Sequence, residues 1–121
     1  PEQVFEKIFD EEIKSADHDD ENILVITGTA GSTDDQKMYL YNLRGKEVLA
    51  EKISCRYSDL VMSGGEIVFT DAQSCHIIRK NGSDKFAFDF GKGFDYLLPA
   101  AGDDRYYYID EASIQQIKIS G

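Results

Sequence analysis

The sequence predicts an all-β protein built from antiparallel four-stranded meanders that repeat about every 40 residues. First, the stretch Asp59–Phe90 holds four short apolar runs separated by three turn-forming sequences rich in Gly, Ser, Asn and Asp. Second, β-branched and aromatic residues dominate these runs, and no segment sustains a helical period. Third, glycines that each follow a short apolar run recur at Gly45, Gly82 and Gly121, which are 37 and 39 residues apart.

The glycine spacing divides a single repeat region, residues 1–121, into the units 2–45, 46–82 and 83–121. Each unit is expected to begin with the outermost strand of one sheet and to continue with the first three strands of the next. The strands are expected near Val4–Phe9, Ile13–Ser15, Ile23–Thr29, Lys37–Asn42, Glu47–Ile53, Asp59–Met62, Glu66–Thr70, Ser74–Arg79, Lys85–Phe90, Asp95–Leu98, Arg105–Ile109 and Ser113–Ile119.

The side-chain pattern of these runs indicates how each strand is buried. Phe86, Phe88 and Phe90 alternate with polar or small residues, as in a half-buried strand. The runs 23–26 and 67–69 are apolar throughout and predict strands buried on both faces. Residues 2–15 also fit one face of a short helix, but the repeat favours a strand there.

Composition excludes several classes of partner. The chain has 121 residues, 23 acidic against 13 basic side chains and a net charge of −10. A surface of this charge cannot neutralise nucleic-acid phosphates or dock on an anionic membrane. No run approaches the roughly 20 apolar residues that span a bilayer. Because the chain starts at Pro1 with a charged segment, we interpret it as an excised piece of a longer protein.

Few residues could carry chemistry. The acidic turn Asp17–Glu21, around His18, lacks the spacing of a calcium-binding loop and is interpreted as a solvated hairpin tip. Asp103-Asp104 is expected at the equivalent charged rim. His76 and Cys75 are adjacent on a strand and point to opposite faces, so they cannot easily form a catalytic pair, and His76 is expected to be half-buried.

The remaining candidates also have structural interpretations. Cys55 and Cys75 lack metal-ligand spacing, and we expect two small buried side chains rather than a disulfide. Tyr106-Tyr107-Tyr108 predicts strand packing on both faces rather than a sugar platform. The glycines at 64–65 and 91–93 indicate turns and not phosphate cradles. We therefore expect no catalytic residue, no cofactor and no metal site in this chain.

The phrase LYNLRGKEV, residues 40–48, resembles the turn from the third to the outermost strand of a β-propeller blade, as does IRKNG, residues 78–82. The chain resembles the C-terminal blades of uncharacterised, membrane-anchored, propeller-like proteins of clostridial bacteria. That resemblance implies an extracytoplasmic location and an anchor outside this sequence, and it supplies no functional residues.

Three blades cannot close a propeller of ordinary geometry. The orphan strand Val4–Phe9 and the incomplete last blade, which ends with Ser113–Ile119, are complementary. Two copies of the chain could therefore form a homodimer of six blades by edge-strand completion. A free-standing β-sandwich is the alternative, but it would not require the glycine register.

The sequence favours a non-enzymatic binding or scaffold module that presents loops to a protein or another ligand. The alternative is a fragment of a propeller enzyme whose active site lies in blades outside this piece. In a propeller, one ring face would carry the links 10–12, 54–57 and 91–94. On that face Arg56, Tyr57 and Phe94 are the residues expected to contact a partner.

Overall fold

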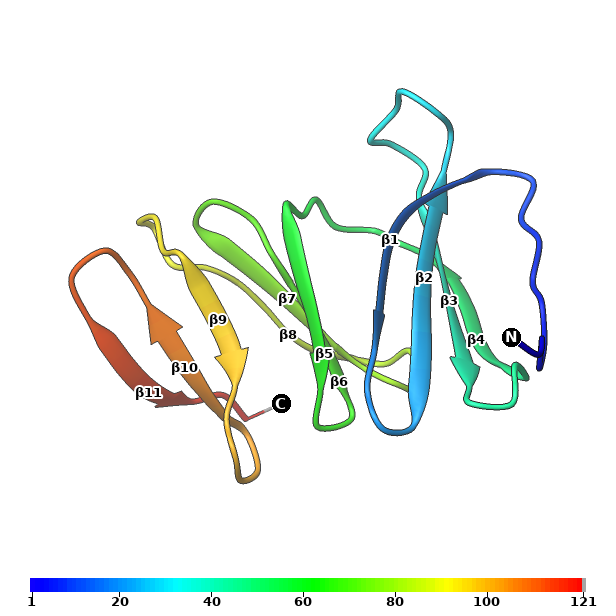
Figure 1. The fold of residues 1–121 in the computed structure, drawn as a ribbon. Coiled ribbons are helices and arrows are strands. Elements are labelled where there is room, and N and C mark those ends of the chain that lie inside the picture. The colour runs from blue at the N-terminus through cyan, green and yellow to red at the C-terminus, as the bar shows by residue number, and fades with distance from the viewer. Residues whose placement is uncertain (121) are drawn as a thin grey trace. The chain divides into compact units, whose positions relative to one another are not determined.

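A computed structural model describes residues 1–120. The described residues form eleven β-strands, no helix and three antiparallel sheets, which are labelled in Figure 1. Sheet 1 contains β1 (Glu12–His18), β2 (Asn22–Gly28), β3 (Lys37–Asn42) and β4 (Glu47–Lys52). Sheet 2 contains β5 (Asp59–Ser63), β6 (Glu66–Thr70), β7 (Ser74–Arg79) and β8 (Asp84–Asp89), and sheet 3 contains β9 (Tyr96–Pro99), β10 (Arg105–Ile109) and β11 (Ile114–Lys118).

The prediction of an all-β fold built from antiparallel meanders is confirmed. Each sheet is a meander in which strands adjacent in sequence are hydrogen-bonded neighbours, and the last sheet has three strands instead of four. The strands β3, β6, β7 and β10 have the predicted boundaries. The chain divides into two compact units, Pro1–Ser54 with sheet 1 and Cys55–Gly121 with sheets 2 and 3.

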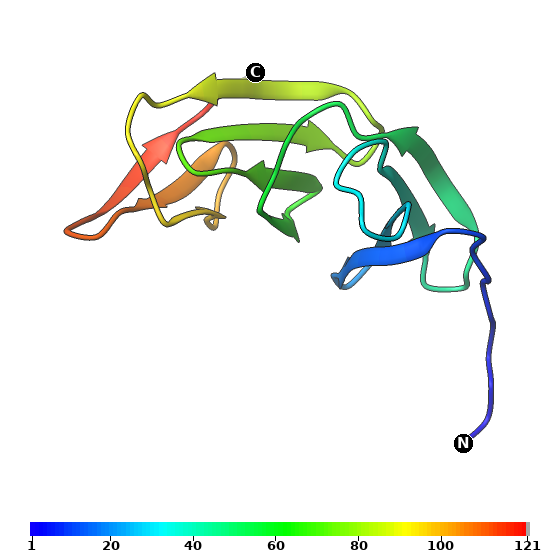
Figure 2. The same ribbon diagram turned by 90° about the horizontal axis from the view of Figure 1, so that it is seen from above.

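The first predicted strand is wrong. Residues 1–9 have no regular secondary structure, neither strand nor the competing helix, and Figure 2 shows them as a single stretch with no strand beside it. A strand needs a hydrogen-bonding neighbour. Side-chain contacts hold the segment instead, because the ring of Phe9 lies 5.1 Å from that of Tyr39 and 6.4 Å from that of Tyr41.

The hairpin turns after β3 and β7 explain two of the repeated glycines. Gly45 and Gly82 have φ values of 87° and 90°, a left-handed conformation that glycine adopts without steric cost. In each turn the glycine N–H donates to the carbonyl three residues earlier, on Asn42 or Arg79. The third glycine, Gly121, lies outside the described residues.

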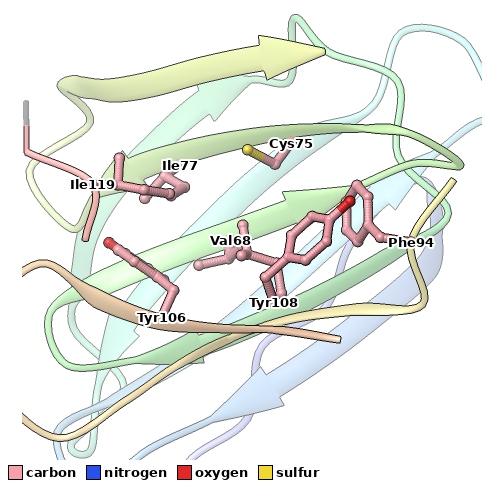
Figure 3. Close-up of a cluster of buried hydrophobic side chains, with 8 residues drawn as sticks. Val68, Cys75, Ile77, Phe94, Tyr106, Tyr108 and Ile119 are labelled. Carbon is pink, nitrogen blue, oxygen red and sulfur yellow. The ribbon is translucent and has the colours of Figure 1, made fainter. Parts of the chain in front are cut away.

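Sheets 2 and 3 pack face to face in the second unit. Figure 3 shows this core, in which side chains from β6 and β7 lie against the tyrosines of β10. Tyr106 and Tyr108 point into it and are buried, whereas Tyr107 points away and is 40% exposed. The prediction that all three tyrosines pack is therefore wrong for Tyr107. The buried members of the core are Val68, Cys75, Ile77, Phe94, Leu97, Tyr106, Tyr108 and Ile119.

Strand β8 departs from the simple alternation that its sequence predicts. The register with β7 shifts between Ile77 and Ile78, which pair with Phe86 and Asp84, so Lys85 is the extra residue of a β-bulge. A bulge re-aims the side chains of its strand. Lys85 consequently points inward and is buried, while Phe88, predicted to share a buried face with Phe86, is 50% exposed.

Candidate functional site

The loops at one end of the second unit are joined by backbone hydrogen bonds. Because the strands alternate in direction, the links into β5 and β9 lie at the same end of their sheets as the β6–β7 and β10–β11 turns. The N–H of Phe94 donates to the carbonyl of Ala72 at 3.2 Å, and that of Phe90 donates to the carbonyl of Gln73 at 2.8 Å. We call residues 55–58, 71–73, 90–95 and 110–113 the loop end.

The loop end contains a hollow of about 510 Å³. Three of its side chains carry carboxylates and one carries an ammonium group, so its wall is acidic overall. Its lining residues are Lys92, Gly93, Phe94, Asp95, Asp110, Glu111 and Ala112.

Asp110 is fixed in the wall of the hollow by its own turn. Its carboxylate accepts hydrogen bonds from the backbone N–H groups of Ala112 at 2.9 Å and Ser113 at 2.8 Å. The bond from Ala112 is the main reason that the pKa of Asp110 lies below its ordinary value, and the charge of Lys92 acts in the same direction. Asp110 therefore stays ionised and is a poor general acid or base near neutral pH.

The structure places the three residues expected to contact a partner in different environments. Arg56 is exposed in the link before β5, and Tyr57 packs edge-on against Phe69 with ring centroids 5.1 Å apart. Phe94 is 9% exposed and packs 5.3 Å from Tyr108. Since Phe69 and its neighbour Val68 point to opposite faces of sheet 2, Tyr57 and Phe94 lie against opposite faces. Only Phe94 lines the hollow, as part of its floor.

One buried hydroxyl lies near that floor. The Tyr108 oxygen is enclosed and has no hydrogen-bond partner among the described residues, although its ring packs against Phe90 and Phe94. An unpaired buried hydroxyl costs roughly 1–3 kcal/mol of stability. The sequence pattern did not predict this unpaired hydroxyl, because alternation gives the direction of a side chain and not its hydrogen-bond partners.

A buried ionic cluster joins sheets 2 and 3, and the sequence did not predict it. The Lys85 ammonium donates to Glu66 and Asp104, each at 2.5 Å, and to the Tyr106 hydroxyl at 2.9 Å. The Tyr106 hydroxyl in turn donates to Glu66. Asp104, expected at a charged rim, is thus part of an interface. We call these four residues the Lys85 cluster.

The electrostatics of the Lys85 cluster indicate a structural role. Burial alone would lower the pKa of Lys85, but the hydrogen bonds to Asp104, Glu66 and Tyr106 together raise it above its usual value. Burial and the bond to Glu66 raise the pKa of Tyr106 to about 12. The hydrogen bond from Lys85 lowers the pKa of Asp104. An ammonium held protonated in this way is not a nucleophile.

The other candidate residues have structural surroundings. His76 is half-buried, as predicted, and its Nε2 lies 2.8 Å from the Asp84 carboxylate. Cys55 and Cys75 are free thiols, and Cys75 is buried as expected while Cys55 is half-buried. Burial raises the pKa of Cys75 to about 11. Within residues 1–120, no group of three or more His, Cys, Asp or Glu side chains is arranged to hold a metal ion.

Comparison with known proteins gives one result. The sequence pattern of DUF5711, a protein family of unknown function, matches residues 1–119. The chain belongs to DUF5711. No curated protein sequence and no solved structure is measurably similar to this DUF5711 chain. Among the residues that the structure describes, this family member has no helix long and apolar enough to cross a membrane.

Proposed function

We propose that this DUF5711 chain is a non-enzymatic binding module whose loop end receives a basic segment of a partner protein. The hollow at the loop end carries this proposal. Its wall offers the carboxylates of Asp95, Asp110 and Glu111 against the single ammonium of Lys92. Such a wall attracts Lys or Arg side chains and repels acidic ones.

The support of the hollow suits binding without large rearrangement. Its floor, Phe94, is packed in the core between the rings of Phe90 and Tyr108. Its wall residue Asp110 is held by a hydrogen-bonded turn. Binding groups that are fixed beforehand lose little conformational entropy when a partner arrives. The lowered pKa of Asp110 makes it a poor general acid or base near neutral pH, so this carboxylate is better suited to binding a cation than to transferring a proton.

A peptide titration tests the proposal. Short peptides of equal length, either Lys/Arg-rich, uncharged or Asp/Glu-rich, would be added to the ¹⁵N-labelled chain while backbone amide shifts are recorded. We expect the basic peptides alone to shift the amides of Gly93 and Glu111, with an affinity that falls as salt is added.

Matched variants distinguish the hollow from the general acidity of the chain. Asp95→Asn and Glu111→Gln each remove one charge from the wall, and both residues are exposed. Asp103→Asn removes the same charge from an exposed turn at the opposite end of sheet 3. We expect the first two variants to weaken basic-peptide binding several-fold and the third to leave it unchanged. Equal weakening by all three, or shifts spread over the whole surface, would refute the assignment.

A further inference from the structure

The packing of sheets 2 and 3 defines two kinds of sheet face. The second strand of each sheet begins at an equivalent residue, Asn22, Glu66 or Arg105, which pairs with the last residue of the third strand in each case. We call the face that carries the third residue of the second strand the front face, and the opposite face the back face. The front face of sheet 2, with Val68, packs on the back face of sheet 3, with Tyr106 and Tyr108.

The back face of sheet 1 corresponds, residue by residue, to the back face of sheet 3, which sheet 2 covers. Ile23 and Val25 on β2 are the equivalents of Tyr106 and Tyr108 on β10. The tyrosines are buried by sheet 2, whereas Ile23 and Val25 are only half-buried. A hollow of about 470 Å³ lies on this face, lined by Ala16, Asp17, His18, Asp19, Ile23 and Leu43.

The segment before sheet 1 already lies on this back face. Phe90, just after β8 and before sheet 3, packs on Tyr108 of the back face of sheet 3 with ring centroids 5.0 Å apart. Phe9, just before sheet 1, packs in the same way on Tyr39 and Tyr41. Tyr39 and Tyr41 pair across the sheet with Val25 and Ile23, so all four side chains share the back face.

The front face of sheet 3 corresponds, residue by residue, to the front face of sheet 2, which covers sheet 3. Tyr107 is the equivalent of Val68, and its cross-strand partners Leu98 and Gln116 are the equivalents of Val61 and Ile77. In sheet 2 these positions are buried or half-buried against sheet 3. In sheet 3, Tyr107 and Gln116 are exposed, and Ile114 beside them is 72% exposed.

Charge complementarity links these two faces. Between sheets 2 and 3, Glu66 and Lys85 face Asp104, which is the second residue before Tyr106. The equivalent of Asp104 in sheet 1 is Glu21, and it follows Asp19 and Asp20 in the acidic turn. The equivalent of Glu66 in sheet 3 is the exposed Arg105, whose cross-strand partner is Lys118. Basic residues on the front face of sheet 3 would therefore meet the acidic turn.

We propose that the front face of sheet 3 in one copy of this chain docks on the back face of sheet 1 in a second copy. Tyr107 and Ile114 enter the hollow between His18, Ile23 and Leu43. Arg105 pairs with Glu21. The contact joins different surfaces, and in the closed dimer that we propose each copy uses both of its faces, so the same contact is made twice. This inference concerns sheet faces and is independent of the loop end.

Charge reversal tests the docking in two steps. Light scattering over a dilution series should show a dimer of the native chain. Arg105→Glu alone and Glu21→Arg alone should each weaken self-association about tenfold or more, because like charges then meet in both contacts of the dimer. An equimolar mixture of the two variants should restore association, because a dimer with one copy of each has opposite charges at both contacts.

Control variants carry the same charge changes elsewhere. Lys92→Glu, in the link after β8, and Asp89→Arg, at the end of β8, alter exposed residues that belong to neither of the two faces and should leave association unchanged. Far-UV circular dichroism would show that each variant is folded. A monomer at every concentration overturns the proposal. A dimer whose dissociation constant is the same for Arg105→Glu and Lys92→Glu also overturns it, and so does a mixture of Arg105→Glu and Glu21→Arg that does not associate more tightly than either variant alone. Loss of peptide binding at the loop end would not affect these outcomes.

Discussion

The Lys85 ammonium lies 2.5 Å from the Asp104 carboxylate, and the two residues belong to different sheets. The side chain of Lys85 is 3% exposed, and its other two N–H groups donate hydrogen bonds to Glu66 and to the Tyr106 hydroxyl. A buried charge is tolerated only when it is paired and hydrogen-bonded. The bulge in β8 makes this possible because it turns Lys85 towards sheet 3.

Replacing Lys85 should therefore destabilise the second unit. In Lys85→Met, Glu66 and Asp104 keep their charges at the interface without a cation. We expect the free energy of unfolding to fall by about 2–3 kcal/mol, at or below the lower limit for a broken buried pair, because both carboxylates still reach some solvent. Urea unfolding would measure the loss. Lys46→Met, at an exposed turn position, is the control and should change stability little. An equal effect of the two variants would contradict a stabilising role of the Lys85 cluster.

The stability that Asp104 contributes should depend on pH in a defined direction. Its pKa is lowered in the folded chain, so its contribution is complete above the ordinary carboxyl pKa of about 3.9 and is lost as pH falls through the folded value. The raised pKa of Lys85 keeps the partner charged up to strongly alkaline pH. We expect the difference in urea midpoint between the native chain and Asp104→Asn to be constant from pH 8 to about pH 5 and to shrink below about pH 4. Shrinkage already between pH 7 and 6 would contradict this.

Two tyrosines on β10 should respond in opposite directions to loss of the hydroxyl. Tyr106→Phe removes an acceptor from Lys85 and a donor to Glu66, and hydrogen bonds to charged groups contribute about 1.5–3 kcal/mol. Tyr108→Phe removes a buried hydroxyl without a partner, so we expect no loss or a gain of up to about 1 kcal/mol. Thermal and urea unfolding of the two variants would be compared. A loss of stability in Tyr108→Phe would indicate that its hydroxyl has a partner.

The sequence predicted the sheets because their signals are local. Alternation, turn residues and the glycine register correctly predicted the first and last residues of β3, β6, β7 and β10. Residues 4–9 have the same local pattern as β4 but no neighbouring strand to pair with, and only the three-dimensional structure shows whether a neighbour exists.

The Lys85 cluster and the surroundings of Phe94 could not be predicted from the sequence for a similar reason. Simple alternation places Lys85 on the exposed side of β8, next to Ala87 and Asp89, and a single bulge reverses it. Asp104 looked like one more surface acid beside Asp103 until the packing of sheets 2 and 3 placed it against Lys85. Phe94 was predicted to contact a partner from a loop. In the structure its ring is buried in the core, and it reaches the surface only where it lines the hollow.

Contact between the N-terminal segment and the turn of sheet 1 can be measured at Gly45. A Cβ atom at this position would lie 2.9 Å from the ring of Phe5, and the φ of 87° is unfavourable for alanine. Gly64 has a φ of 61° but nothing within 4 Å of its position for a Cβ, so Gly64→Ala has backbone strain alone. We expect both variants to lose about 1 kcal/mol from strain. Gly45→Ala should lose more, because Phe5 must move. In a Phe5→Ala background the two losses should become equal, as measured by thermal unfolding. If they stay different, the Phe5 ring does not rest on Gly45 in solution.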